Sequence, residues 1–320
     1  MTRRRIPAAL LAAATLLLTA ACGYAPTEVP DPPEPVAATS GTPAAAPTCD
    51  DATTSYAPPD PMPGPGEFPS GSHMRLIEDR GRLIVGVSAD SLMLGARNPL
   101  SGEIEGFDID MARAVAEAIL GDPDRIQLRV ITAGDRIPVL ENDMVDIVVR
   151  NMTMTCGRWE QIAFSAEYYH SGQKILVRQG SDITGLETLA GHRVCAPNAT
   201  SSMDNLIQHA PDAEPVGAAN HTGCLVLFQR GAVDAITGDD TVLAGLAAQD
   251  PYAVVLEEDA FSEEPYGIGV PQDSPELAAF INGVLEQMRE DGRWDEAYDR
   301  WLAPHLGAGS GQPTPVYGRT

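Results

Sequence analysis

Two charged residues that lie far apart in the sequence have the chemistry needed to hold a zwitterion. Arg158 ends the run Asn151-Met-Thr-Met-Thr-Cys-Gly-Arg158, and Asp239 ends the run Val233-Asp-Ala-Ile-Thr-Gly-Asp239. An arginine binds a carboxylate through a planar, bidentate fork, whereas an ammonium group needs a carboxylate and neutral oxygen atoms. Arg158 and Asp239 supply these two charges, and Thr153 with nearby main-chain carbonyls supplies the oxygens. The pattern indicates a site for a free amino acid.

The elements that must position these residues form two α/β units of similar order. In the first unit, strands and helices alternate over Leu83–Val87, Ile109–Ile119, Ile126–Ile131, Arg136–Glu141 and Val145–Val149, with Asp108 as the expected N-cap of the first helix. In the second unit, they alternate over His192–Ala196, Ser201–His209, Ala213–Val216, Thr222–Arg230 and Val233–Thr237. This alternation predicts a mainly parallel sheet in each unit. The two final helices, Pro275–Glu290 and Trp294–Trp301, are expected to pack on the first unit, and crossings near Tyr168–Gly172 and Pro265–Ile268 are expected to form a hinge.

Three polar segments follow strands directly. Asn151–Arg158 follows the last strand of the first unit, and Asn198–Ser202 and Gly238–Asp239 follow strands of the second unit. Ligands of open α/β sheets bind beyond the carboxyl ends of the strands. We therefore expect all three segments to face one cleft between the units.

The N-terminus has the features of a secretion signal. Three arginines precede an apolar run from Ile6 to Leu18, which is shorter than the ~20 residues that span a bilayer. Cleavage after residue 21 would leave Cys22 as the lipidated first residue, anchored to the outer face of the cell membrane. Thr19 departs from the leucine usual in a lipoprotein cleavage box, and the alternative is ordinary cleavage with a free cysteine. Residues 22–72 and 307–320 are rich in small residues, proline and glycine, and we expect them to be a disordered tether and a disordered tail.

Charge and cysteine content narrow the function classes. The chain has 21 basic and 45 acidic residues and a formal charge of −24, which argues against a nucleic-acid partner. The chain has five cysteines, and four remain for pairing if Cys22 is lipidated. Cys195 and Cys224 lie in one compact region, so their pairing would leave Cys49 to pair with Cys156. A metal site is the competing interpretation of these cysteines, but the chain has no CxxC or HxxxH spacing.

From about Met74 to Leu306 the chain resembles the polar amino-acid binding proteins of bacterial ABC importers, and within them the actinobacterial glutamate-binding lipoproteins. The resemblance rests on motifs in a fixed order, namely Val85-Gly-Val87, Gly102–Asp110, Val145-Asp-Ile147, Thr153-x-Thr155-x-x-Arg158, Phe164-Ser165 with Tyr168-Tyr169, and Val233-Asp-Ala235 with Asp239; the closer likeness lies at Cys195, Cys224 and Asp239–Gly245. It implies the type 2 periplasmic-binding fold, with lobe 1 at 73–170 and 267–306 and lobe 2 at 171–266. It also implies a monomer that needs no cofactor and presents an amino acid to an ABC permease.

The resemblance also assigns roles to individual residues. Arg158 would hold the α-carboxylate, assisted by Thr200 and the N–H groups of Ser201 and Ser202 at a helix N-terminus. Asp239, the Thr153 hydroxyl and the Asn151 carbonyl would hold the α-ammonium. The alternatives are a surface salt bridge of Arg158 with Glu160 or Glu167 and a helix N-cap role for Asp239.

The ligand side chain depends on further residues. Glutamate or aspartate brings a second carboxylate and so requires another cation. The resemblance assigns that role to Arg136, and the alternative for Arg136 is a solvated position on a helix. Arg97 and Arg150 are further candidates for the cation, and Asp90 is a candidate for the mouth of the pocket. Some acidic amino-acid binders have a lysine where this chain has Ser88, which leaves room for asparagine or glutamine.

Two other functions fit the same fold. A sensor subunit would pass ligand occupancy to a membrane signalling protein instead of a permease. A dehydratase would need a general acid or base near the cleft, but every charged residue placed there already has a binding role. We therefore expect a binding protein and not an enzyme.

Overall fold

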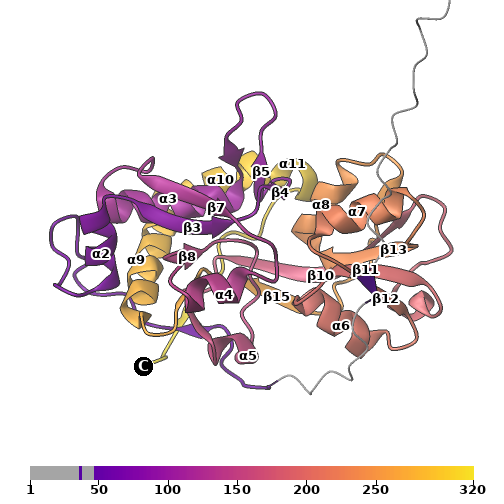
Figure 1. The fold of residues 1–320 in the computed structure, drawn as a ribbon, viewed down its shortest axis with the longest axis horizontal. Coiled ribbons are helices and arrows are strands. Elements are labelled where there is room, and N and C mark those ends of the chain that lie inside the picture. The colour runs from indigo at the N-terminus through magenta and orange to yellow at the C-terminus, as the bar shows by residue number, and fades with distance from the viewer. Residues whose placement is uncertain (1–35, 38–46) are drawn as a thin grey trace, which may run out of the picture. The chain divides into compact units, whose positions relative to one another are not determined.

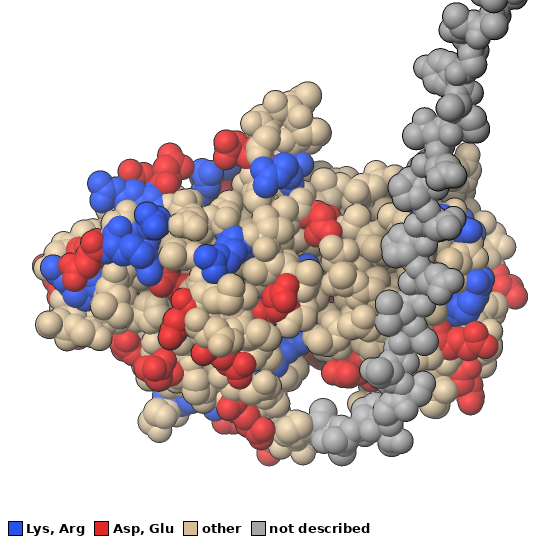
Figure 2. Space-filling view, viewed as in Figure 1, with Lys and Arg blue, Asp and Glu red and all other residues tan. Residues whose placement is uncertain are grey.

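The computed structural model describes residues 36–37 and 47–320, which form two α/β lobes connected by paired strands (Figure 1). Cys22 and the predicted signal peptide lie outside the described residues. No helix in the described part of the chain is both long and apolar enough to span a bilayer. Basic and acidic side chains are interspersed on the face shown in Figure 2.

Lobe 1 is built on a five-stranded sheet in the order β7-β3-β8-β16-β9. Its main strands are β3 (Leu83–Val87), β7 (Ile126–Val130), β8 (Ile147–Val148), β9 (Ile162–Phe164) and β16 (Gly269–Pro271). Its helices are α2 (His73–Arg80), α3 (Phe107–Leu120), α4 (Arg136–Glu141), α5 (Cys156–Trp159), α9 (Pro275–Asp291), α10 (Arg293–Trp301) and α11 (Ala303–Leu306). The helices α9 and α10 contact α3, so the two final helices return to the first lobe.

A small three-stranded sheet and a two-stranded sheet complete lobe 1. The first contains β4 (Asp90–Ser91), β5 (Gly95–Arg97) and β6 (Ile104–Glu105), and the second pairs β2 (Thr54–Ser55) with β17 (Val316–Tyr317). The chain turns from β6 into α3 at Gly106, where φ is 145° and a Cβ would lie 2.3 Å from the Leu94 carbonyl oxygen. Only glycine fits this close approach.

Lobe 2 is built on a larger sheet in the order β1-β12-β11-β13-β10-β14. Its strands are β1 (Val36–Ala37), β10 (Tyr169–Arg178), β11 (Arg193–Pro197), β12 (Glu214–Ala218), β13 (Ala235–Asp239), β14 (Ala253–Val255) and β15 (Glu263–Tyr266), the last of which pairs with β10. Its helices are α6 (Ser201–His209), α7 (His221–Gln229), α8 (Asp240–Ala247) and the short 3-10 helix Leu186–Leu189.

Each sheet is more mixed than predicted. The strands β11, β12 and β13 are parallel, as are β3, β7 and β8, which confirms the α/β class. Antiparallel strands then extend both sheets, namely β10 and β14 in lobe 2 and β16 and β9 in lobe 1. These strands lead into or out of the other lobe, so the βαβ pattern of one lobe could not predict their direction.

The hinge consists of β10 and β15. These strands pair in an antiparallel manner, from Tyr169 opposite Tyr266 to Gly172 opposite Glu263. Lobe 1 is tied to the same strands, since the Met154 N–H donates to the Pro265 carbonyl at 2.8 Å. The two crossings expected from the sequence therefore lie side by side as hydrogen-bonded strands.

The two segments expected to be disordered differ from that prediction within the described residues. Phe68 is buried against Phe280 of α9, with ring centroids 5.4 Å apart, and Asn282 donates to the Ser55 hydroxyl at 2.9 Å. The C-terminal segment reaches β17, which pairs in parallel with β2. A few aromatic and β-branched anchors hold both segments on lobe 1, and average composition does not reveal such anchors.

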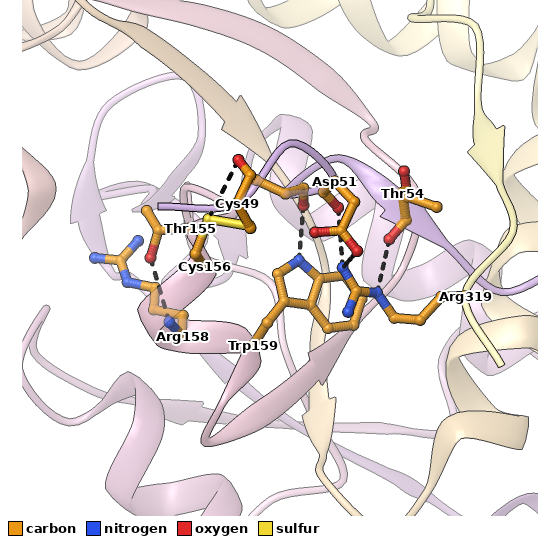
Figure 3. Close-up of a disulfide and its surroundings, with 9 residues drawn as sticks. Cys49, Asp51, Thr54, Thr155, Cys156, Arg158, Trp159 and Arg319 are labelled. Carbon is orange, nitrogen blue, oxygen red and sulfur yellow. Dashed lines mark hydrogen bonds and ion pairs between the residues drawn. A yellow bond between two sulfur atoms is a disulfide. The ribbon is translucent and has the colours of Figure 1, made fainter. Parts of the chain in front are cut away.

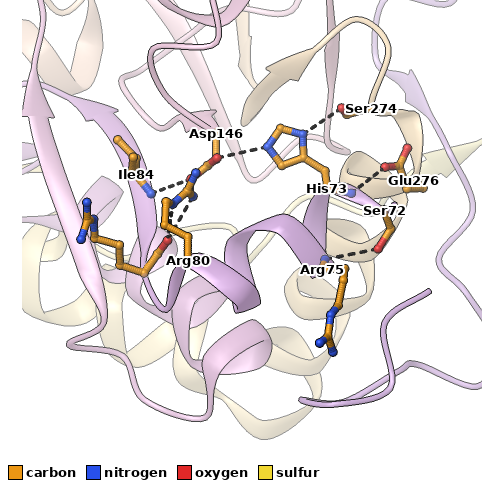
Figure 4. Close-up of polar contacts among 9 residues, drawn as sticks. Ser72, His73, Arg75, Arg80, Ile84, Asp146, Ser274 and Glu276 are labelled. Atoms are coloured by element: carbon orange, nitrogen blue, oxygen red, sulfur yellow. Dashed lines mark hydrogen bonds and ion pairs between the residues drawn. The ribbon is translucent and has the colours of Figure 1, made fainter. Parts of the chain in front are cut away.

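The segment before β3 is fixed by a polar cluster that the sequence did not indicate (Figure 4). His73 of α2 lies between Ser274 Oγ at 3.0 Å and Asp146 Oδ1 at 3.1 Å. Asp146 also pairs with Arg80 and accepts from the Ile84 N–H at 2.7 Å. The cluster joins α2 to the sheet and to the start of α9.

Asp108 does not cap α3 as expected. Gly106 is the N-cap residue, and Asp108 lies in the first turn with its carboxylate buried. That carboxylate accepts from the Asn151 N–H at 3.0 Å and from the Tyr168 hydroxyl at 2.8 Å. Burial raises the pKa of Asp108 to about 6 against the lowering effect of these hydrogen bonds. Asp108 thus supports the loop that carries Asn151.

Candidate functional site

A small cavity lies where strand ends of both lobes meet. It has a volume of about 10 Å³. Its lining combines residues of lobe 1 with residues after β11 and β13 of lobe 2, namely Ala133, Arg136, Arg150, Asn151, Thr153, Thr200, Ser201, Ser202, His221 and Asp239. Seven of the ten predicted ligand-binding residues are therefore brought together at one site. Contacts across this cavity include Thr153 Oγ1 to Ser201 Oγ at 3.0 Å, so the two lobes are closed on each other here.

Three arginines supply the positive charge of the site. Within residues 47–320, their guanidinium groups donate only to main-chain carbonyl oxygens: Arg136 to Ala133 and Asn151 at 2.9 and 3.1 Å, Arg150 to Ile131 at 3.1 Å, and Arg158 to Thr153 at 2.6 Å. The alternative of a surface salt bridge for Arg158 is thus not what the structure shows, nor is Arg136 a solvated helix residue, since it is 4% exposed.

The electrostatics of these arginines favour a bound anion. Burial lowers the pKa of Arg136 well below its usual range, and the charges of Arg158 and Arg150 lower it further. Burial also lowers the pKa of Arg158, against the opposing effect of Glu264 and Asp239. Neutral carbonyl partners satisfy N–H groups without cancelling charge. A carboxylate placed among these side chains would be stabilised by charge-assisted hydrogen bonds.

Asp239 supplies the negative charge on the opposite wall. It is 3% exposed, and its Oδ2 accepts from the Tyr266 hydroxyl at 2.6 Å and from Asn151 Nδ2 at 3.4 Å. Its Oδ1 has no hydrogen-bond partner among the described residues, and neither has Asn151 Oδ1. Burial, and secondly the charge of Glu264, raise the pKa of Asp239 to about 7. Asp239 is the N-cap residue of α8, but its side chain makes no capping hydrogen bond.

The N-terminus of α6 forms a third part of the wall. Thr200 caps this helix, because its hydroxyl accepts from the Met203 N–H at 3.2 Å and donates to the Pro197 carbonyl at 2.7 Å. The N–H groups of Ser201 and Ser202 precede the first intrahelical bond, from Asp204 N to Thr200 O. Orphan N–H groups at a helix N-terminus attract anions.

Three of the ten predicted residues are not among those that line the cavity, namely Arg158, whose contacts are given above, Asp90 and Arg97. Asp90 joins the lobes instead, since its carboxylate accepts from Asn220 Nδ2 at 2.6 Å and its carbonyl accepts from the Thr222 hydroxyl at 3.0 Å. Arg97 lies on β5, and its guanidinium donates to the Gly102 carbonyl within the same exposed hairpin. In this structure Arg97 is held by its own hairpin and does not line the cavity.

Sequence reasoning missed Glu264 and His221. Glu264, on β15, is buried beside Thr153 and Ser201. In the sequence it follows Ser262 and Glu263 and directly precedes the predicted hinge crossing, so nothing indicated that it would be buried. His221 opens α7 with Nε2 3.3 Å from the Thr237 carbonyl oxygen, and burial lowers its pKa to about 3. His221 lines the cavity, and its position in the sequence gave no sign of this.

Both predicted disulfides are present in the structure, between Cys49 and Cys156 and between Cys195 and Cys224. The first joins the N-terminal segment to α5, which also carries Arg158 (Figure 3). The next residue of α5, Trp159, donates to the Ala52 carbonyl at 2.7 Å and lies under the Arg319 guanidinium, 3.8 Å from its ring centroid. Both ends of the described chain thus brace the helix that presents Arg158.

Comparison with known proteins places this geometry in a family. The chain is 38% identical over 227 residues to the ABC transporter glutamine-binding protein GlnH of Bacillus subtilis, which covers 71% of this chain and 83% of the relative. It is 30% identical over 256 residues to the glutamate-binding protein GluB of Corynebacterium glutamicum, which covers 77% of this chain and 85% of the relative. Both are named as binding proteins, in agreement with the prediction that this chain is not an enzyme.

Solved structures agree with the fold. An ancestral arginine-binding protein bound to glutamine superposes with a TM-score of 0.66 at 32% identity, covering 72% of this chain and 99% of that one. A family description, bacterial extracellular solute-binding proteins, family 3, matches residues 83–304. The expected type 2 periplasmic-binding fold is thereby confirmed, and this chain belongs to the bacterial extracellular solute-binding proteins of family 3.

Proposed function

We propose that this protein binds an acidic α-amino acid, glutamate or aspartate, and delivers it to an ABC importer, with glutamine and asparagine bound more weakly. The observation that carries the proposal is the pairing of opposite charges across one cavity. An unpartnered Asp239 oxygen faces the cavity from lobe 2, and Arg136 lines it from lobe 1 with only carbonyl partners. Arg158, which also donates only to a carbonyl, lies close enough for its charge to act on Arg136 and Asp239.

In this proposal, Arg158 and the N–H groups of Ser201 and Ser202 bind the α-carboxylate. Asp239 Oδ1, Asn151 Oδ1 and the Thr153 hydroxyl bind the α-ammonium. The Asn151 carbonyl, assigned to the ammonium from the sequence, already accepts from Arg136 at 3.1 Å, so the side-chain oxygen is the better candidate. The ligand would bring one positive and one negative group to a site that offers both.

Arg136 is the proposed partner of the ligand side chain. A glutamate side chain would place a carboxylate beside a buried guanidinium whose present partners are uncharged. A glutamine side chain would leave that charge without a counter-ion, which is costly in a buried site. The relatives named above are called glutamine-binding and glutamate-binding, so ligands with an amide and with a carboxylate side chain both occur in their names.

Ligand entry requires the lobes to separate. The cavity of about 10 Å³ is far below the ~300–1,000 Å³ of typical small-molecule sites. The contacts that must break lie on one side of the hinge and include Asp90 with Asn220 and Thr153 with Ser201. A rotation about β10 and β15 would open the cavity while the core of each lobe stays intact.

Calorimetric titration with the twenty amino acids tests the binding proposal, using residues 22–320 with Cys22→Ser. We expect glutamate and aspartate to bind most tightly. Tightest binding of arginine, lysine or a branched aliphatic amino acid would contradict the assignment of Arg136.

We also propose that Cys22 is lipidated after export, so that the protein is held at the outer face of the membrane. The support is the cleavage-box sequence alone, and this cysteine lies outside the described residues. Labelling cells with a radioactive fatty acid should mark the wild-type protein and not Cys22→Ser. Equal labelling of both would contradict lipidation at this residue.

A further inference from the structure

Glu264 lies at the point where the hinge meets both lobes. It is 1% exposed, and its carboxylate accepts four hydrogen bonds. Oε1 accepts from Asn205 Nδ2 at 2.8 Å and from Ser262 Oγ at 2.9 Å, whereas Oε2 accepts from Thr153 Oγ1 at 2.6 Å and from Ser201 Oγ at 2.7 Å. One carboxylate therefore contacts the hinge, lobe 1 and the N-terminal turn of α6.

The bonds to Oε2 determine what the two hydroxyls can still do. A hydroxyl has one hydrogen to donate and two lone pairs with which to accept. The two hydroxyl oxygens also lie 3.0 Å apart, but each hydroxyl has a single hydrogen. When both hydroxyls donate to Glu264, neither donates to the other, and each has only lone pairs left for further partners. Both residues line the cavity, so their two hydroxyls can accept hydrogen bonds from a ligand but cannot donate to it, whereas the main-chain N–H of Ser201 remains a donor.

This polarity distinguishes the two ends of an amino acid. An ammonium group donates three hydrogen bonds and a carboxylate donates none. A wall that only accepts therefore suits the ammonium and repels a carboxylate or keto oxygen. The same wall lies beside Asp239, whose pKa is raised in part by the charge of Glu264, so the two carboxylates act on the same region.

We propose that Glu264 is a positioning residue that makes the site specific for an amine, by holding the Thr153 and Ser201 hydroxyls with their lone pairs toward the ligand. The inference rests on the proposed function and adds a ligand requirement to it. The protein should discriminate between an α-amino acid and the matching 2-oxo acid, although both carry the same carboxylates. The amine-accepting wall is built from the hinge and both lobes, so it is complete only when the lobes are closed.

The variant Glu264→Gln tests this directly, because it keeps the size of the side chain and replaces one acceptor oxygen by a donor NH₂ group. Asn205 Nδ2 donates to Gln173 Oε1 at 2.9 Å as well as to Glu264, so this side of the pocket continues to need an acceptor. The new amide would thus turn its oxygen to Asn205 and its NH₂ group to Thr153 and Ser201. Both hydroxyls would then accept from the amide and become free to donate toward the ligand.

Affinities for glutamate and 2-oxoglutarate are measured by calorimetry for wild type and Glu264→Gln. We expect the ratio of the two affinities to fall by about tenfold or more, the size of a charged hydrogen bond. We also expect the midpoint of the pH dependence of glutamate binding to move to lower pH, because removal of the Glu264 charge lowers the pKa of Asp239. The matched control Ser262→Ala removes one bond to Oε1 and should change neither quantity.

Thr153→Val provides a second test that does not depend on how Glu264→Gln folds. This variant should weaken glutamate binding and leave 2-oxoglutarate binding unchanged or stronger, because the lost oxygen is an acceptor. Equal losses for both ligands, or an unchanged affinity ratio in Glu264→Gln, would overturn the inference while leaving amino-acid binding in place. A wild-type protein that binds no amino acid would overturn the proposed function and this inference with it.

Discussion

Lowering the pH should weaken ligand binding, because Asp239 must be ionised to hold an ammonium group. Burial is the main cause that raises its pKa to about 7, followed by the charge of Glu264, while hydrogen bonds from Tyr266 and Asn151 act in the opposite direction. A bound ammonium favours the ionised carboxylate. Below pH 7, binding must therefore release the proton that Asp239 holds in the free protein.

The magnitude follows from the fraction of ionised Asp239. With a pKa of about 7, the carboxylate is almost fully ionised at pH 8 and about 1% ionised at pH 5. If only the ionised form binds, the apparent Kd rises about tenfold for each pH unit below 7. The expected increase between pH 8 and pH 5 is about a hundredfold. Glutamate itself stays mainly in one charge state over this range, since its carboxyl pKa is about 4.3.

Isothermal titration calorimetry at pH 8, 6 and 5 measures both the affinity and the proton release. Each titration is repeated in two buffers with different ionisation enthalpies, so that the number of released protons is obtained separately. We expect nearly one proton at pH 5 and almost none at pH 8. An affinity that stays flat between pH 8 and pH 5, or binding without proton release, would refute the assignment of Asp239 to the ammonium.

Two variants separate Asp239 from its neighbours. Asp239→Asn should bind weakly with little dependence on pH. Asp108 has a raised pKa of about 6 and accepts from the Asn151 N–H, so Asp108→Asn tests whether that carboxylate causes the pH dependence of binding instead. We expect Asp108→Asn to retain the pH dependence.

The same pKa shift predicts how the stability of the free protein changes with pH. The pKa of Asp239 rises from 3.8 in the unfolded chain to about 7 in the folded protein, so the folded state binds its proton more tightly. The resulting contribution to the free energy of unfolding is fully present below pH 3.8 and is lost as the pH rises through about 7. This shift corresponds to a loss of about 4 kcal/mol in the free energy of unfolding. Asp239→Asn should therefore unfold at a higher urea concentration than wild type at pH 8 and show a smaller difference at pH 4. A variant less stable than wild type at pH 8 would contradict this sign.

Four other changes test the site and its supports. Arg158→Ala should abolish calorimetric binding of every amino acid, with a loss above the ~1.5–3 kcal/mol of one charged hydrogen bond, and retained binding would remove it as the anchor. Arg136→Ala should weaken glutamate more than glutamine, and equal losses would make this residue structural. Arg319→Ala should lower the free energy of unfolding by about 1–3 kcal/mol in urea titrations, with partial recovery in Arg319→Lys, because it loses an indole contact and three hydrogen bonds. Replacing Cys49 and Cys156 by serine should cost at most ~4–5 kcal/mol by the same measurement, and no change would show that the segment is held without the disulfide.

Much of the site was predictable because its residues follow strands of a regular α/β pattern. Asn151 follows β8 in the sheet of lobe 1, and Thr200 and Asp239 follow or end β11 and β13 in the sheet of lobe 2. All three line one cavity, as expected from their positions at the carboxyl ends of strands. These patterns depend on residues close in the sequence, which is why they are reliable.

What could not be predicted depends on contacts between distant segments. The role of Glu264 requires the register of β15 against β10, which no local pattern determines. Residues 47–72 and 307–320 are held on lobe 1 by a few side chains such as Phe68 and Arg319, although the average hydrophobicity of both segments is low. The position of Arg97 depends on a local hairpin contact instead, because its guanidinium donates to the Gly102 carbonyl and so lies away from the cavity.

The pairing of β10 with β15 has a consequence for protein engineering. All of lobe 2 that follows Ser171 is one continuous segment whose two ends are neighbours in the hinge, and its disulfide between Cys195 and Cys224 closes within it. Such a segment is a natural cassette that can be exchanged between family members at two adjacent junctions. The exchange would carry Asp239 to the new protein and leave Arg136 and Arg158 behind, so a chimera would inherit the charged partner of the amine from one parent and the charged partners of the carboxylates from the other.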